Sequence, residues 1–165
     1  MSARAANFLG FLVCAGLLGF AYYAQFSLHL EPCPLCILQR AGIFAVGVVF
    51  LAAALHGPGG AGGRVYFALA VFAAAATAAV SARQLWIQSQ PPGTVAACGA
   101  SLEFMMKILP WKEVLMKVLN GSGECAKVDW RLLGLAMPAW VLIAAAGLAA
   151  WAGFANLRPP LRPRY

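Results

Sequence analysis

Charged residues are scarce in this chain. They make up 10% of its 165 residues, whereas 62% are hydrophobic, and soluble domains usually carry roughly 25% charged residues. So few charges cannot cover a surface that faces water. The composition therefore disfavours a helical bundle folded in water and indicates a protein that is dissolved in a membrane.

Histidines and closely spaced cysteine pairs are scarce as well. His29 and His56 are the two histidines, and they are expected at opposite ends of the membrane layer, so they cannot ligate one haem. A zinc site usually takes its four thiolates from two close pairs. The chain has one close pair, Cys33 and Cys36, so zinc is disfavoured and no metal site is predicted.

Long apolar runs are abundant. Four segments, about 8–28, 37–55, 65–87 and 132–154, reach the roughly 20 residues that a membrane helix needs. We predict an all-α integral membrane protein, a bundle of four transmembrane helices that forms a single membrane domain over residues 1–165. Its two cysteine-bearing loops are expected over residues 29–36 and 88–131. The first run is interpreted as a spanning helix because no convincing cleavage site follows it.

The longer loop contains an amphipathic stretch from Ser101 to Leu119. Its apolar side chains share a broad side, three lysines stay polar, and Pro110 interrupts the run before Trp111. This pattern predicts one or two short helices in the membrane interface, with the tryptophan as an anchor. Packing against the bundle explains the pattern equally well, and the two interpretations are compatible.

The cysteines and the termini are expected on opposite sides of the membrane. An even number of helices places both termini on one side, and both loops with cysteines, which hold four of the five, on the other. Cys14 falls inside the first helix and is interpreted as a small buried apolar residue. The positive-inside rule does not settle the orientation, because five Lys and Arg lie near the terminal side and seven near the cysteine side. Disulfides persist in oxidising compartments, which predicts that the cysteine-bearing loops are periplasmic and the termini cytoplasmic.

The stretch EPCPLCILQR, residues 31–40, is typical of a redox site. A helix N-terminus and a nearby cation lower the pKa of a thiol, and the thiolate is its reactive form. Arg40 follows Cys36 by one helical turn, so it can stabilise a Cys36 thiolate or an anion beside it; an arginine that snorkels to the interface is the alternative. Two disulfides, a catalytic one in this motif and one that closes the longer loop, fit the four cysteines best. A purely structural loop disulfide remains the alternative.

EPCPLCILQR resembles the first redox motif of the disulfide bond formation protein B (DsbB) family. GECAKVDWRLLGLAMPAW, residues 123–140, resembles the segment that carries the last cysteine of that family into its fourth helix. The resemblance covers nearly the whole chain in length, helix count and loop order. It differs at two points: Trp86 to Gly93 contains no histidine where well-studied members often have one, and Gln39 replaces a glutamate that commonly precedes the family arginine.

The resemblance implies a bacterial inner-membrane enzyme that reoxidises the periplasmic dithiol oxidase DsbA and passes the electrons to ubiquinone or menaquinone. The partner would attack Cys98 and free Cys125, which would then attack Cys33 and release Cys36 as a thiolate. Cys36 would donate electrons to the quinone at the apolar mouth of the bundle, where Arg40 stabilises the reduced form. DsbA, the quinone and the lipid bilayer are the expected partners of a monomer; no nucleic acid is expected.

Two other functions are compatible with parts of the sequence. A vitamin K epoxide reductase-like enzyme is also a four-helix thiol oxidant linked to quinone, but its extra loop cysteines and its usual thioredoxin-like fusion are not evident. A non-catalytic membrane scaffold stapled by disulfides is the other alternative. Quinone reduction in the presence of a reduced thioredoxin-fold partner distinguishes an enzyme from a scaffold.

Overall fold

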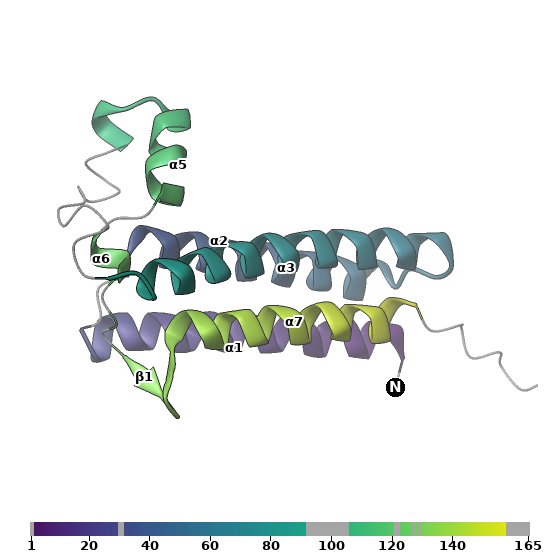
Figure 1. The fold of residues 1–165 in the computed structure, drawn as a ribbon. Coiled ribbons are helices and arrows are strands. Elements are labelled where there is room, and N and C mark those ends of the chain that lie inside the picture. Colours follow the sequence, from purple (N-terminus) through teal and green to yellow (C-terminus); the bar gives the residue numbers. More distant parts are fainter. Residues whose placement is uncertain are drawn as a thin grey trace, which may run out of the picture.

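The computed structural model describes residues 2–29, 32–91, 106–120, 123–126, 128 and 130–157. Its long helices are α1 (Ala3–Ser27), α2 (Pro34–His56), α3 (Ala61–Gln88) and α7 (Met137–Asn156). All four are long and apolar enough to cross a membrane, and they lie side by side in one bundle (Figure 1). The prediction of a four-helix membrane bundle is confirmed.

The helices pack in a ring. α1 contacts α2, α2 contacts α3, α3 contacts α7, and α7 returns to α1. Figure 1 shows the start of α1 and the end of α7 at one end of the bundle, which we call the terminal end. The opposite end, which carries Cys33, Cys36 and Cys125, is called the cysteine end. It also carries the short helices α5 (Trp111–Asn120) and α6 (Gly123–Ala126).

Local caps start the first two helices earlier than the apolar runs suggest. Ser2 caps α1, and its hydroxyl oxygen accepts a hydrogen bond from the Ala5 backbone N–H at 3.2 Å. Cys33 takes the same capping position before α2. Pro34 occupies the first turn, where the missing proline N–H has no partner inside the helix in any case. The helices therefore begin at Ala3 and Pro34 rather than near residues 8 and 37.

The fourth helix begins at Met137, and its predicted start at Leu132 is wrong. Residues 131–136 instead form a hairpin of β1 (Arg131–Leu132) and β2 (Leu135–Ala136), with Leu132 opposite Leu135. Leu133 and Gly134 make its two-residue turn with φ values of 52° and 82°, the left-handed conformations that a tight hairpin needs. The apolar composition of this segment conceals the turn, so hydrophobicity alone extends the helix too far.

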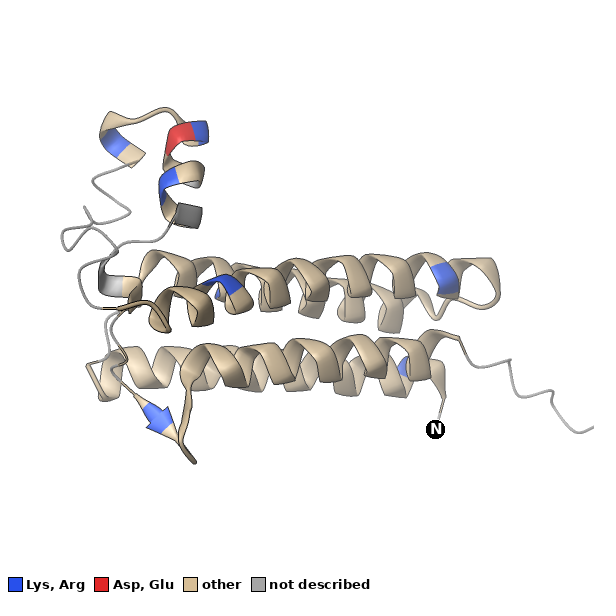
Figure 2. Ribbon diagram, in the orientation of Figure 1, with Lys and Arg blue, Asp and Glu red and all other residues tan. Residues whose placement is uncertain are grey.

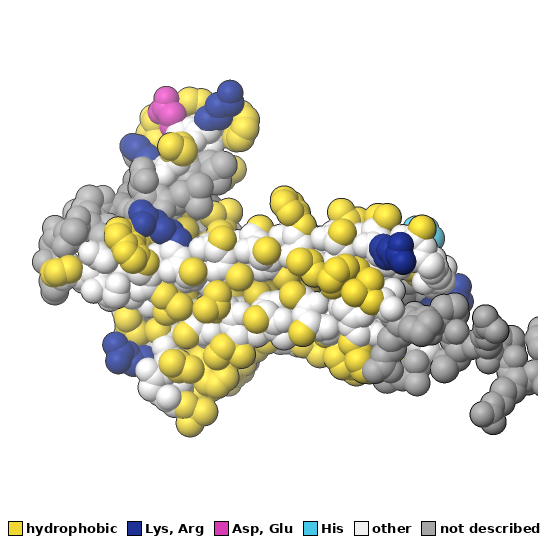
Figure 3. Space-filling view, turned by 45° about the vertical axis from the view of Figure 1, so that its right-hand side comes forward, with side chains coloured by type: hydrophobic (Ala, Val, Ile, Leu, Met, Phe, Trp, Pro, Cys, Tyr) yellow, Lys and Arg dark blue, Asp and Glu magenta, His cyan; other side chains and the backbone are white. Residues whose placement is uncertain are grey.

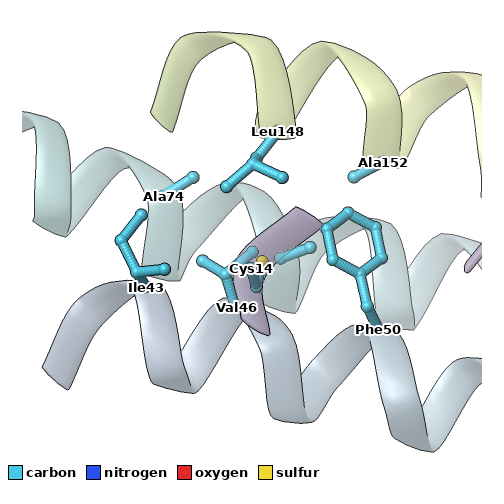
Figure 4. Close-up of a cluster of buried hydrophobic side chains, with 8 residues drawn as sticks. Cys14, Ile43, Val46, Phe50, Ala74, Leu148 and Ala152 are labelled. Atoms are coloured by element: carbon cyan, nitrogen blue, oxygen red, sulfur yellow. The ribbon is translucent and has the colours of Figure 1, made fainter. Parts of the chain in front are cut away.

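Small side chains let the helices approach closely, as is common in membranes. Ala70, Ala74 and Ala152 are buried between α3 and α7. The gaps beside them are filled by larger residues, including Phe50 and Leu148 (Figure 4). Cys14 lies in this same cluster and is 1% exposed, which agrees with its interpretation as a small buried residue.

The outer surface of the bundle is apolar, as a lipid-facing surface must be. Phe72 is 77% exposed and Leu55 is 72% exposed. Figure 3 shows hydrophobic side chains along the flanks of the helices. Charged residues instead lie toward the two ends of the bundle, on α5 and on the hairpin (Figure 2).

The amphipathic stretch forms α5, a helix with one buried side and one exposed side. A helical turn over residues 106–108 precedes Pro110, and α5 follows it; residues 101–105 lie outside the described part of the chain. Val114 and Val118 of α5 are buried against the cysteine end. Trp111 and Met116 are exposed. α5 therefore packs on the bundle with one side, and the membrane contact of its other side stays a prediction.

Candidate functional site

Cys33 and Cys36 form a close sulfur pair at the start of α2. Their Sγ atoms are 2.8 Å apart. The Cys33 sulfur accepts a hydrogen bond from the Cys36 backbone N–H at 3.3 Å, so it caps the helix while it faces the second sulfur. The spacing of the motif and the start of the helix at Pro34 together produce this geometry, which brings the two sulfurs within reach of disulfide formation.

Cys125 packs beside Cys33. It belongs to α6, is completely buried, and packs in one apolar cluster with Cys33, Leu35, Ile87, Val114 and Val118. Its side chain makes a hydrogen bond with Cys33. The structure thus brings together three of the four cysteines predicted to be catalytic. Cys98, the fourth, lies outside the described residues.

The environment of Cys33 opposes a negative charge on its sulfur. The pKa of the Cys33 thiol lies well above its ordinary value, because hydrogen bonds with Cys125 and then Cys36 hold its proton and because the side chain is buried. The thiolate form of Cys33 is therefore disfavoured.

Two glutamine side chains complete the site, and sequence reasoning missed one of them. Gln84 of α3 donates from Nε2 to the Cys33 sulfur at 3.3 Å and to the Cys36 sulfur at 3.5 Å. Gln39 of α2 donates from Nε2 to Gln84 Oε1 at 2.8 Å. A buried amide in an apolar spanning helix is itself a signal of a functional position, and this signal could have identified Gln84.

Arg40 points toward α1. Its guanidinium donates to Gln25 Oε1 and, at 3.1 Å, to the Ala21 carbonyl oxygen, and it lies 5.3 Å from the centre of the Tyr22 ring. Among the described residues, its hydrogen-bond partners do not include Cys36. The stabilisation of a Cys36 thiolate by Arg40 therefore stays a prediction, and Gln25 is a second polar residue that sequence reasoning missed.

A cavity of about 320 Å³ opens beside the sulfur pair. Most of its lining is apolar and comes from α1, α2, α7 and the hairpin, for example Leu18, Ile43, Trp130, Met137 and Val141. Its polar lining consists of Cys33, Cys36, Gln39, Arg40, Gln84 and Gln88. Cys125 is not among the lining residues, although it packs in one cluster with Cys33.

Hydrogen bonds join α1 and α7 at the terminal end of the bundle, away from the cavity. At the terminal end, Asn7 of α1 and Asn156 of α7 exchange two hydrogen bonds of 3.0 Å, and Trp151 donates to the Ala6 carbonyl oxygen at 2.9 Å. Toward the cysteine end, residues of the same two helices line the cavity instead. A mostly apolar cavity with a few polar groups is typical of a small-molecule site.

The described residues contain no group of three or more His, Cys, Asp or Glu side chains arranged to hold a metal ion. The histidine expected between Trp86 and Gly93 has no counterpart in this chain. Trp86, Ile87 and Gln88 form the last turn of α3 rather than part of a loop, and residues 92 and 93 lie outside the described part of the chain.

Comparison with known proteins gives consistent matches. The family model described as "Disulfide bond formation protein DsbB" matches residues 3–155. A disulfide bond formation protein B of Marinobacter nauticus is 52% identical over 143 residues, which cover 87% of this chain and 85% of the relative. The proteins of the same name from Chromobacterium violaceum and Hahella chejuensis are 52% and 48% identical, over 92% and 97% of this chain and 93% and 97% of their own lengths.

Proposed function

The chain belongs to the DsbB family of disulfide bond formation proteins, and we propose that it is a membrane thiol:quinone oxidoreductase. In this proposal it reoxidises a periplasmic dithiol oxidase of the DsbA type and passes the electrons to ubiquinone or menaquinone. One observation carries the proposal: Cys33 and Cys36 line a mostly apolar cavity in a membrane bundle, and Cys125 is buried in one cluster with Cys33.

The thiol chemistry proceeds by exchange. A partner thiolate attacks Cys98 of a Cys98–Cys125 disulfide, so that a mixed disulfide forms and Cys125 leaves as a thiolate. Cys125 then attacks Cys33. The Cys33–Cys125 bond forms, the Cys33–Cys36 bond breaks, and the electron pair moves to Cys36. The burial of Cys125 beside Cys33 supports the second exchange, because the attacking and accepting sulfurs already share one cluster.

The cavity supports a lipid-soluble acceptor. A bound quinone would take up two electrons and two protons. The apolar lining of the cavity fits a hydrophobic ring, and its volume falls in the range of small-molecule sites. Cys36 lines the cavity as the electron donor. Its two-electron oxidation would re-form the Cys33–Cys36 bond and release Cys125 as a thiolate. Arg40 lines the same cavity and supplies a positive charge there. Such a fixed charge stabilises a developing anion without reorganisation.

The direct test is electron transfer with purified protein. A reduced thioredoxin-fold partner and a soluble quinone analogue are mixed with the full chain, and thiol loss and quinone reduction are followed together. We expect matched rates for both, and loss of quinone reduction in Cys36→Ser. Cys14→Ala is the control, because Cys14 packs in the bundle core away from the redox cluster. A folded wild-type protein that oxidises the partner without reducing quinone, or does neither, contradicts the proposal.

A further inference from the structure

The Gln84 side chain contacts both sulfurs of the Cys33–Cys36 pair. Its amide nitrogen lies 3.3 Å from Cys33 Sγ and 3.5 Å from Cys36 Sγ, and the residue is 3% exposed. We propose that Gln84 is a catalytic residue of thiol exchange, which donates a hydrogen bond to the sulfur that becomes a thiolate. This inference deepens the proposed function and rests on it.

Gln39 holds the Gln84 amide in the required orientation. It donates to Gln84 Oε1 at 2.8 Å, and it is 4% exposed. This bond fixes the amide beside the sulfurs, with its nitrogen near both of them. Gln84 Oε1 also accepts a hydrogen bond from the Cys36 thiol at 3.8 Å, but a Cys36 thiolate has no proton to donate, so the Gln84 N–H group is then the partner of its sulfur. Gln39 therefore acts as a positioning residue through Gln84.

The donor matters at one moment of the exchange. When Cys125 attacks Cys33, a Cys33–Cys125 bond forms and the electron pair of the Cys33–Cys36 bond leaves on Cys36. The Cys36 sulfur lies between an apolar cluster and a mostly apolar cavity, and such surroundings offer few hydrogen-bond donors to a thiolate. The Gln84 N–H group is a donor already in place, and hydrogen bonds to charged groups are stronger than those between neutral groups.

The other buried polar residues of α3 do not have this role. The hydroxyls of Thr77 and Ser81 donate to carbonyl oxygens of their own helix, at Ala73 and Thr77. Both residues are buried like Gln84, but their hydroxyls satisfy local backbone. Ser81 therefore offers a matched control for the loss of a buried polar group from α3.

The test measures the equilibrium between the Cys33–Cys36 pair and glutathione buffers. The full chain carries Cys98→Ser and Cys125→Ser, so that the disulfide followed is the one between Cys33 and Cys36. A hydrogen bond to the thiolate favours the reduced pair. We therefore expect Gln84→Met to shift the equilibrium about tenfold toward the disulfide, which is about 30 mV toward a more negative potential.

Two further variants make the test decisive. Gln39→Met should shift the same equilibrium in the same direction by a smaller factor, about threefold. This substitution leaves the Gln84 amide free to rotate but keeps its N–H donor. Ser81→Ala should leave it within twofold of the starting protein. An unchanged potential in Gln84→Met, or an equal shift in Ser81→Ala, overturns the inference. The glutathione equilibrium needs neither quinone nor partner, so loss of quinone reduction in the wild type, with the Gln84→Met shift intact, contradicts only the proposed function.

Discussion

Arg40 is fixed in position by α1 while it lines the cavity. Its two hydrogen-bond partners, Gln25 and the Ala21 carbonyl, and the ring of Tyr22 all belong to that helix. A planar guanidinium can satisfy both acceptors at once, and an ammonium cannot match that fork. The residue is thus more rigid than an arginine that merely snorkels to the membrane surface.

Substitution of Arg40 tests its role at the cavity. Arg40→Met removes the charge, so we expect a loss of roughly 1.5 to 3 kcal/mol in the stabilisation of the reduced acceptor, or about ten- to a hundredfold in quinone use. Arg40→Lys should be intermediate. Quinone reduction at several quinone concentrations measures the effect. Arg83→Met is the control, because Arg83 stacks on Trp86 at 4.3 Å and does not line the cavity. Wild-type affinity and rate in Arg40→Met would restore the snorkelling interpretation.

At the scale of elements, the contact between α2 and α3 sets the geometry of the redox site. α2 carries the sulfur pair and Gln39, and α3 carries Gln84. Below the site the two helices meet at Gly42, where an added Cβ would lie 2.1 Å from Thr77 Oγ1. The missing side chain of Gly42 therefore permits the approach that Gln84 needs.

A methyl group at Gly42 should separate these helices. Gly42→Ala is expected to destabilise the protein by about 1 to 3 kcal/mol, the usual cost of overpacking, and to slow thiol exchange because Gln84 moves away from the sulfurs. Thermal unfolding in detergent measures the first effect. Gly16→Ala is the matched control, because the added Cβ meets no neighbouring helix within 4 Å. Alanine favours a helix by up to about 1 kcal/mol over glycine, so this variant should not lower the stability. Equal stability of Gly42→Ala and wild type would show that the contact is not tight.

The short elements at the cysteine end connect the loop cysteine to the bundle. α6 buries Cys125, and the residues after it contribute Val128 and Trp130 to the cavity. The Trp140 indole N–H donates to the Leu132 carbonyl oxygen at 3.2 Å, which ties the hairpin to α7. The hairpin thus forms part of the cavity wall, a role that a continuous helix would not provide.

At the scale of the whole molecule, the fold separates two ends with different chemistry. The cysteine end holds the sulfurs, and the terminal end holds the Asn7–Asn156 clasp and both ends of the described chain. If the cysteine end is periplasmic, a membrane-impermeant thiol reagent should label reduced Cys98 in intact spheroplasts. Cys14, which is 1% exposed in the bundle core, should stay unlabelled and serves as the control. Labelling of Cys98 only after lysis would reverse the proposed orientation.

The sequence by itself determined the class of fold and the position of the first redox motif. Both are local properties: an apolar run of sufficient length spans a bilayer whatever its neighbours are, and Cys33 and Cys36 are three residues apart on one helix start. The helix ends were less predictable. The helix starts are determined by the caps at Ser2 and Cys33 and by the left-handed turn at Gly134. A pattern of hydrophobic residues does not reveal caps or turns.

Only the tertiary structure decided which residues meet at the site. Cys125 reaches Cys33, and Gln84 reaches both sulfurs, although each comes from a distant part of the chain. These contacts depend on how the helices pack against each other, and that packing depends on small residues such as Gly42 and Ala74. Arg40 illustrates the same limit. Its spacing predicts a place beside Cys36, but its hydrogen bonds go to α1, because a long side chain binds whichever acceptors the neighbouring helix presents.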